Sequence, residues 1–131
     1  MGDIEVVEAI YAAMAERDLD RLFELISPDL VLTQDPALPW GGAYVGHEGF
    51  ATFGLTLTST IDSKVTFAAI FEADGDVIEM GRTAGTVVAT GQPFDVAEVH
   101  RWTIRDGRAV TAHFSIDTAA MLAALDAGPV S

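Results

Sequence analysis

The sequence contains no cysteine and few basic residues, and both shortages limit what the protein can be. Without cysteine, the chain can form neither a disulfide framework nor a thiolate metal site. It carries 7 Lys and Arg residues against 20 Asp and Glu residues, which gives a net charge of −13. Because a field of that sign repels phosphate backbones and anionic lipid surfaces, we expect no nucleic-acid partner and no membrane partner.

Long hydrophobic runs are also missing. No apolar stretch approaches the roughly 20 residues needed to span a bilayer, and the amino terminus MGDIEVVEAI is acidic where a signal peptide would be basic. We therefore expect a cytoplasmic protein. A length of 131 residues with 50% hydrophobic residues predicts one compactly folded domain over residues 1–131, with room for one binding site.

Three segments in the first half show helical spacing. In residues 3–16, Val7, Ile10, Tyr11 and Met14 form one apolar stripe, and Asp3 is a candidate N-cap. A shorter helix over residues 18–26 ends at a Ser-Pro pair, so the two helices form a hairpin. A third helix is predicted over residues 47–60.

Strand patterns dominate the rest of the chain. Residues 29–34 alternate apolar and polar side chains, and a proline- and glycine-rich loop follows over residues 35–42. From residue 64 the period is two, and turn signals divide the chain into four strands and a terminal helix. These segments are residues 64–73, 77–90, 94–105, 108–116 and 118–127. Helices followed by an antiparallel meander indicate an α+β fold with helices on one face of the sheet.

The second sheet face also carries apolar residues. The strand over residues 94–105 places Val96, Trp102 and Ile104 on one side and Ala97 and Val99 on the other. The side without helices needs another cover. We therefore expect a homodimer formed through the sheet.

Three segments carry a family resemblance: residues 9–29, residues 38–49 (LPWGGAYVGHEG) and residues 99–110 (VHRWTIRDGRAV). In their order and spacing they resemble the nuclear transport factor 2-like superfamily, in its SnoaL-like and ketosteroid isomerase-like branch. The resemblance implies a cystatin-like cone, in which a curved antiparallel sheet and N-terminal helices enclose an apolar pocket. It leaves function open, since members include isomerases, polyketide cyclases, dehydratases, epoxide hydrolases and proteins that only bind.

The ketosteroid isomerase pattern implies roles for individual residues. Tyr11 resembles the phenol that donates a hydrogen bond to the substrate oxygen, and Asp35 resembles the carboxylate that moves the proton. Val99 stands where that enzyme has a protonated aspartic acid, so half of the oxyanion hole would be missing. This correspondence would place Val99 in the pocket wall.

Two aspartates each allow two interpretations. Asp35 lies beside Pro36, Leu38 and Trp40, where a carboxylate would lose hydration and act as a general base. It would otherwise initiate an exposed proline turn. Asp117 closes the last strand and is either an acid–base residue or the N-cap of the terminal helix.

His100 shares a strand side with Glu98 and Trp102. Its imidazole could relay a proton or orient a carboxylate, or it could be a hydrogen-bonded sheet residue. His113 could face it across the hairpin, and His47 begins a helix. Because the three histidines lack metal-ligand spacing, we expect no metal and no cofactor.

Aromatic and sulfur-containing side chains supply the candidate pocket wall, since ligand cavities are lined mainly by such groups. The candidates are Trp40, Tyr44, Phe50, Phe53, Phe71, Met80 and Trp102.

These residues predict a cofactor-independent acid–base enzyme of the isomerase, cyclase or dehydratase type, acting on a small hydrophobic carbonyl compound. Asp35 would be the base and Tyr11 the hydrogen-bond donor. A non-catalytic ligand-binding or dimerisation protein is one alternative. The other is an epoxide hydrolase-like site, with Arg82 or Arg101 held between Asp35 and Asp117.

Overall fold

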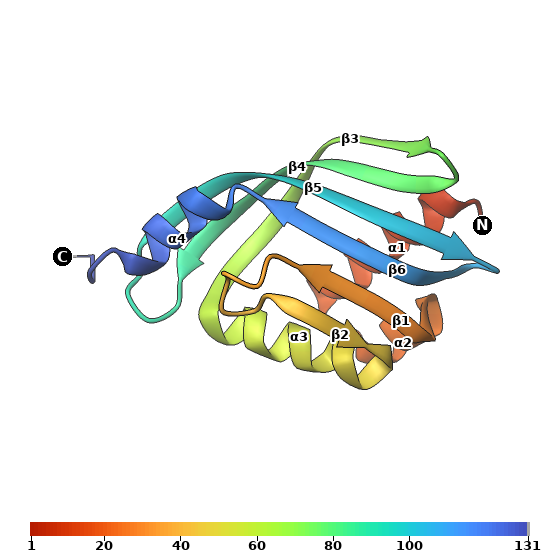
Figure 1. Cartoon of the computed structure of the whole chain (residues 1–131), viewed down its shortest axis with the longest axis horizontal. Helices are drawn as coiled ribbons and strands as arrows, with labels where there is room; N and C mark the ends of the chain where they lie inside the picture. Colours follow the sequence, from red (N-terminus) through yellow and green to blue (C-terminus); the bar gives the residue numbers. More distant parts are fainter. Residues whose placement is uncertain (131) are drawn as a thin grey trace.

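In the computed structural model, which describes residues 1–130, the chain forms four helices and six strands (Figure 1). The helices are α1 (Asp3–Glu16), α2 (Leu19–Leu25), α3 (Gly46–Thr60) and α4 (Thr118–Asp126). The strands are β1 (Ile26–Gln34), β2 (Gly42–Val45), β3 (Ile61–Ala73), β4 (Asp76–Val87), β5 (Pro93–Arg105) and β6 (Arg108–Ile116). Within these residues, no helix is both long enough and apolar enough to cross a bilayer.

All six strands belong to one curved sheet in the order β2-β1-β6-β5-β4-β3. Strands β3 to β6 form the predicted antiparallel meander. The sheet is nevertheless mixed, because β1 pairs with β6 in parallel. Strand β2, in a segment for which the sequence predicted no strand, pairs antiparallel with β1. The predicted α+β fold with a curved sheet is correct, and the parallel pairing of β1 with β6 is a feature that the sequence did not predict.

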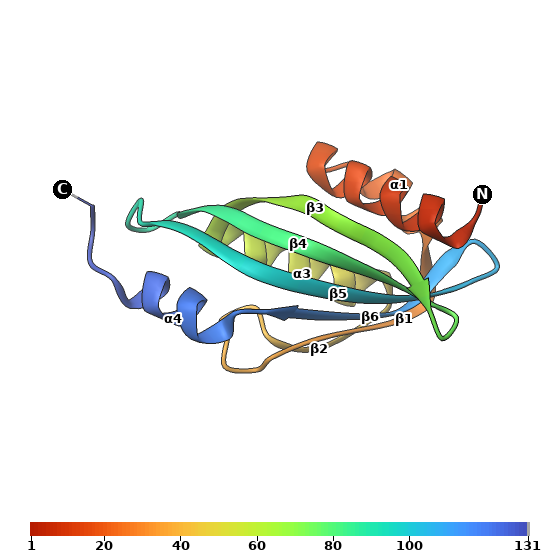
Figure 2. The same cartoon turned by 90° about the horizontal axis from the view of Figure 1, so that it is seen from above.

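Helices α1 and α3 lie against the same, concave face of the sheet (Figure 2). Strand β5 shows the resulting asymmetry, because its even-numbered residues from Phe94 to Ile104 are buried and most of its odd-numbered residues are exposed. Period-two alternation of this kind directs successive side chains to opposite faces. Even positions of β5 therefore point to the interior of the cone.

A bulge in β3 changes which of its residues face the interior. The register with β4 shifts between Phe67 and Ala69, and this single extra residue reverses the alternation beyond it. Phe67 packs edge-on against Tyr11 with ring centroids 4.9 Å apart. Phe71 lies past the bulge, where it pairs with Ile78 and is 40% exposed on the outer face.

Both predicted aspartate caps can be compared with the structure. Helix α1 is capped by Gly2, so Asp3 is its first helical residue and the predicted N-cap was wrong by one position. At α4 the Asp117 side chain accepts a hydrogen bond from the Ala120 N–H at 3.1 Å. Such a bond satisfies a backbone donor that the first helical turn would otherwise leave open. Asp117 is the N-cap of α4.

Candidate functional site

Four polar side chains meet inside the cone between α1 and the sheet. Tyr11 comes from α1, Glu79 from β4, and Glu98 and His100 from β5. Antiparallel pairing puts Glu79 directly opposite His100, and Glu98 lies two residues before His100 on the same face. All four side chains are buried, with exposed fractions of 9% or less. We call these four residues the buried cluster.

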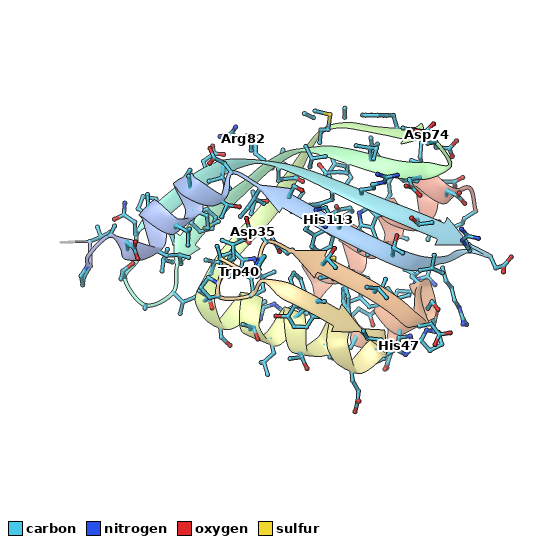
Figure 3. The ribbon with its side chains drawn as sticks, in the orientation of Figure 1. Asp35, Trp40, His47, Asp74, Arg82 and His113 are labelled. Carbon is cyan, nitrogen blue, oxygen red and sulfur yellow. The ribbon has the colours of Figure 1, made fainter. Side chains whose placement is uncertain are left out.

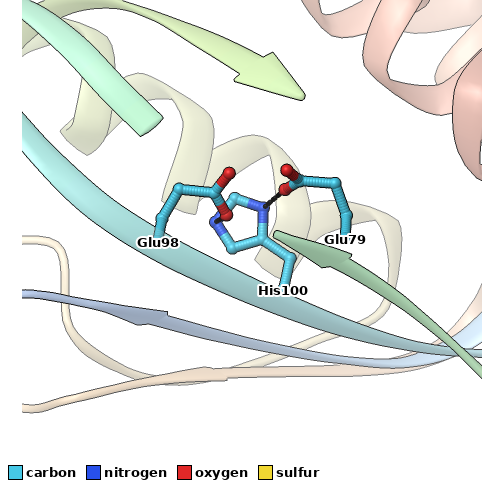
Figure 4. Close-up of side chains that lie close together, drawn as sticks. All are labelled: Glu79, Glu98 and His100. Atoms are coloured by element: carbon cyan, nitrogen blue, oxygen red, sulfur yellow. Dashed lines mark ion pairs between the residues drawn. The ribbon is translucent and has the colours of Figure 1, made fainter. Parts of the chain in front are cut away.

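His100 lies at the centre of the buried cluster, with a carboxylate at each ring nitrogen (Figure 4). Its Nδ1 lies 3.3 Å from Glu79 Oε1, and its Nε2 lies 3.3 Å from Glu98 Oε2. The Tyr11 hydroxyl oxygen lies 2.5 Å from Nδ1 and 3.3 Å from Glu79 Oε1. The indole N–H of Trp102 donates to that hydroxyl oxygen at 3.1 Å. One imidazole therefore joins a phenol and two carboxylates.

Burial favours the uncharged forms of these groups. It raises the pKa of Glu98 to about 9, with the neighbouring Glu79 adding to the effect. Burial also raises the pKa of Glu79 and that of the Tyr11 hydroxyl, and it lowers the pKa of His100 to about 3. Removing a charged group from water is the common cause. Burial therefore favours a neutral imidazole and opposes the ionisation of both glutamates at once.

A small cavity of about 60 Å³ lies beside His100. On this measure a cavity needs roughly 10–15 Å³ to hold one water molecule, so this space admits a very small molecule or one end of a larger one. His100 is the one ionisable side chain among the described lining residues, and Gln34, Ser63 and Thr83 add polar groups. The apolar lining residues are Met14, Trp40, Phe53, Leu57, Ile61, Val65, Phe114, Ile116 and Met121.

Asp35 does not reach this cavity. Its side chain is exposed and accepts a hydrogen bond from the Ala37 N–H at 2.9 Å, which is the turn geometry that an Asp-Pro pair favours. It borders a separate, open groove of about 400 Å³ together with His113 (Figure 3). The interpretation of Asp35 as a buried general base was wrong, because the loop after β1 turns its carboxylate outward.

The epoxide hydrolase arrangement is also not assembled. Arg82 pairs with Asp95 at 2.9 Å, and Arg101 pairs with Asp76 at 2.5 Å, and both arginines are exposed. Neither of these ion pairs uses Asp35 or Asp117. Asp117 is occupied as a helix cap.

The candidate wall residues divide into three groups. Trp40 and Phe53 line the cavity. Tyr44, Phe50 and Trp102 pack behind it, with the Tyr44 hydroxyl donating to the Trp40 carbonyl at 3.1 Å. The remaining three face outward. Phe71 is 40% exposed, Met80 42% and Val99 38%. The predicted pocket positions of Phe71, Met80 and Val99 were wrong, because the β3 bulge and the alternation of β4 and β5 direct them to the outer face.

The other two histidines lie elsewhere. His113 is exposed and its Nδ1 lies 2.6 Å from the Thr33 hydroxyl. It pairs with Arg101 rather than facing His100. His47 contacts the Ile26 carbonyl at 2.7 Å. The three histidines form no joint site.

Glu79, Glu98 and His100 have the donor types of a metal site, with one ligand atom from each lying within 4.8 Å of the others. The carboxylates, however, flank opposite nitrogens of one ring, and each lies 3.3 Å from its own nitrogen. An imidazole placed between two acids in this way can exchange protons at both ends. We therefore interpret the cluster as an acid–base site.

Sequence reasoning found Tyr11 and His100 but missed the two glutamates as site residues. The signal for Glu98 was present, because its spacing put it on the side of His100 and Trp102. Glu79 had no comparable signal, since its place opposite His100 depends on the register between β4 and β5.

Comparisons with known proteins place this geometry in context. A family model described as the SnoaL-like domain matches residues 7–112. No curated protein sequence matches the chain significantly.

Among solved structures, an NTF2-like protein of unknown function from Burkholderia pseudomallei has a TM-score of 0.87 at 26% identity, over 97% of this chain and 100% of that one. IdmH from Streptomyces antibioticus, described as a candidate polyketide cyclase, has a TM-score of 0.78 at 26% identity, over 97% and 100% of the two chains. A protein with a ketosteroid isomerase-like fold from Catenulispora acidiphila has a TM-score of 0.79 at 19% identity, over 95% and 98%, and shows similarity of fold alone.

Proposed function

Since the chain belongs to the SnoaL-like domain family of the NTF2-like superfamily, we propose that it is an acid–base enzyme that moves a proton on a small, neutral, hydrophobic carbonyl compound. The observation that carries the proposal is His100, a neutral imidazole that borders the cavity and has a protonated glutamic acid at its Nε2. His100 takes the place in this proposal that the sequence had given to Asp35.

The imidazole is the group that exchanges protons with the substrate, because it borders the cavity. In its neutral form it accepts the proton when the C–H bond next to a carbonyl group breaks, and the imidazolium then returns a proton to another atom of the same molecule, which restores the starting state. Glu98, whose oxygens are buried, holds its own proton at His100 Nε2. General base catalysis of this kind needs a group that is unprotonated at the working pH. The reaction types are isomerisation, cyclisation or dehydration, and no cofactor takes part.

The cavity supports the neutral, hydrophobic character of the substrate. Every Lys and Arg of the chain is exposed, and the cluster adds two buried glutamates. An anionic ligand would therefore find no cation to pair with, at a large desolvation cost. Met14, Leu57 and Met121, which come from three different helices, form part of the wall. Methionine side chains adapt their shape readily, so a substrate larger than the cavity would enter by displacing them.

The similarity to IdmH supports a carbonyl substrate, because polyketides are built around carbonyl groups and that protein is described as a candidate polyketide cyclase. The test is to incubate the protein with a panel of hydrophobic enones and β-diketones in D₂O and to follow C–H exchange and isomerisation by NMR. We expect catalysed exchange above the buffer rate for at least one member. Binding of panel members without exchange or conversion of any of them would instead support a ligand-binding protein.

We also propose that the outer face of the sheet pairs with a second copy of the chain. Phe71, Ile78, Met80 and Val99 adjoin one another across β3, β4 and β5. The ion pairs Arg82–Asp95 and Arg101–Asp76 flank them and present both signs of charge, which a two-fold interface can match with itself.

Met80→Lys is expected to shift the sedimentation coefficient from dimer to monomer at micromolar concentration, because it would bury an unpaired charge in that interface. Val45→Lys, at an exposed position on the short strand β2, is the control. A wild-type protein that sediments as a 13.9 kDa monomer would contradict the pairing.

A further inference from the structure

The buried cluster contains more hydrogen-bond acceptors than donors, and this imbalance fixes how many protons it holds. Trp102 brings one N–H, Tyr11 one O–H and neutral His100 one N–H. The acceptors are the phenol oxygen, the second imidazole nitrogen and four carboxylate oxygens. Three of those oxygens, Glu79 Oε2 and both oxygens of Glu98, are buried with no hydrogen bond satisfying them, and the nearest nitrogen to Glu98 is His100 Nε2 at 3.3 Å from Oε2. Two ionised carboxylates so close together and so deeply buried would be strongly unfavourable, so one shared proton is required.

Two arrangements of that proton satisfy the whole chain of contacts. In the first, Glu98 is protonated and donates to His100 Nε2, His100 Nδ1–H donates to the Tyr11 oxygen, and the Tyr11 O–H donates to Glu79. In the second, Glu79 is protonated and donates to the Tyr11 oxygen, the Tyr11 O–H donates to His100 Nδ1, and His100 Nε2–H donates to Glu98. The same three separations, 3.3 Å from Glu98 to Nε2, 2.5 Å from Nδ1 to the Tyr11 oxygen and 3.3 Å from that oxygen to Glu79, serve both arrangements. Trp102 donates to the Tyr11 oxygen in each.

We propose that Glu79, Tyr11, His100 and Glu98 form one proton relay that holds a single proton for its two carboxylates, so that the tautomer of His100 reports which glutamate is protonated. Going from the first arrangement to the second breaks the Glu98 O–H, the His100 Nδ1–H and the Tyr11 O–H bonds. It forms a new His100 Nε2–H bond, a new Tyr11 O–H bond and a Glu79 O–H bond. Three protons move by one place each, and the negative charge moves from Glu79 to Glu98.

The two ends of the relay lie in different surroundings, so proton transfer along it has a direction. Glu98 pairs with Ile116, which lines the cavity, whereas Glu79 pairs with Ile70 and His100 and accepts from Tyr11 on α1. When the Glu98 end of the relay, nearer the cavity, gives up a proton, a proton that moves from the Glu79 end can replace it. No water molecule needs to enter for this. This use in turnover rests on the proposed function, but the relay itself does not. In it, Tyr11 is a positioning residue whose hydroxyl acts through His100, rather than a direct donor to substrate.

The test is the tautomer of His100, read from its side-chain ¹⁵N chemical shifts at pH 8. The His100 signals are identified by their loss in His100→Gln. In Glu98→Gln, Glu79 is the remaining carboxylate of the cluster and must accept a hydrogen bond, so we expect His100 in the Nδ1–H form. In Glu79→Gln, Glu98 is the remaining acceptor, so we expect His100 in the Nε2–H form. Opposite tautomers in these two isosteric variants support the relay, and the same tautomer in both overturns it.

Tyr11→Phe separates the relay from simple packing. Without the hydroxyl, His100 Nδ1 loses its 2.5 Å partner and keeps only the Glu79 carboxylate, 3.3 Å away. The ¹⁵N chemical shift of Nδ1 should therefore change. Tyr44→Phe is the matched control, because its hydroxyl contacts backbone carbonyls outside the cluster, and Glu72→Gln on exposed β3 controls for loss of a carboxylate. In the Glu79→Gln background, Tyr11→Phe removes the O–H that donates to Nδ1, so the tautomer should stay Nε2–H while the Nδ1 chemical shift moves towards that of an unbonded nitrogen. An unchanged Nδ1 shift would contradict the role of the hydroxyl. None of these readouts requires turnover, so their failure is distinct from failure of the proposed function.

Discussion

Replacing Glu98 by glutamine is expected to remove most of the loss of stability that the wild-type protein shows between pH 6 and pH 9. The folded state holds Glu98 protonated, with its pKa raised from 4.5 to about 9 by burial. The unfolded chain releases that proton near the ordinary glutamate value. The native state therefore binds more protons, and its stability falls as pH rises through this window. At about 1.4 kcal/mol for each pKa unit, the effect amounts to several kcal/mol.

Glutamine cannot ionise, so the free energy of unfolding of Glu98→Gln, measured with urea, should be nearly constant from pH 7 to pH 9. Above pH 8 the variant should be more stable than the wild type. Glu72→Gln, at an exposed position, should follow the wild-type curve. Parallel curves for Glu98→Gln and wild type would show that Glu98 is already ionised in the folded protein at neutral pH.

His100 acts at the other end of the pH range. Burial lowers its pKa to about 3 in the folded state, whereas the unfolded chain protonates it near 6.5. Stability should consequently fall as pH drops below 6.5, because the unfolded state then binds the additional proton. Together with the effect of Glu98, this predicts that the wild-type protein is most stable in a narrow interval around pH 5 to 6.

Local patterns were enough to predict most of the secondary structure. The helix α1 was predicted with its observed bounds from one apolar stripe, and β6 from the turn at Asp106-Gly107. What local patterns did not contain was long-range pairing. Strand β1 lies beside β6 although about 75 residues separate them in the sequence, and no nearby turn signal announces a parallel partner. Strand β2 has four residues, too few for its alternation to stand out from the loop before it.

The candidate site was also predicted only where it depends on local patterns. Alternation along β5 put Glu98, His100 and Trp102 on one face, and the structure confirms that placement. The bulge between Phe67 and Ala69 has no distinctive residue, so the outward turn of Phe71 could not be read from its period-two pattern. The position of Glu79 opposite His100 follows from pairing across a whole hairpin. Asp35 was misassigned because hydrophobic neighbours in sequence do not ensure burial of the carboxylate itself.

The largest catalytic effect is expected from His100→Gln. If His100 exchanges protons with the substrate, removing the imidazole should lower kcat/KM by about 10²- to 10⁴-fold, the usual contribution of a general acid or base. Glutamine keeps an amide that can still accept from Tyr11, so the network around it has a substitute partner. Rates would be measured on whichever enone or β-diketone the wild-type protein converts, with folding checked by urea unfolding.

Two controls distinguish chemistry from disturbance of the fold. His113→Gln removes an exposed imidazole on the outer face, and Asp35→Asn removes the carboxylate of the exposed turn; both should retain the wild-type rate. A fall with Asp35→Asn comparable to that with His100→Gln would return the base to the loop after β1 and would require that loop to fold inward when substrate binds. Loss of rate in His100→Gln alone would assign proton transfer to the imidazole, because His100 is the ionisable side chain that borders the cavity.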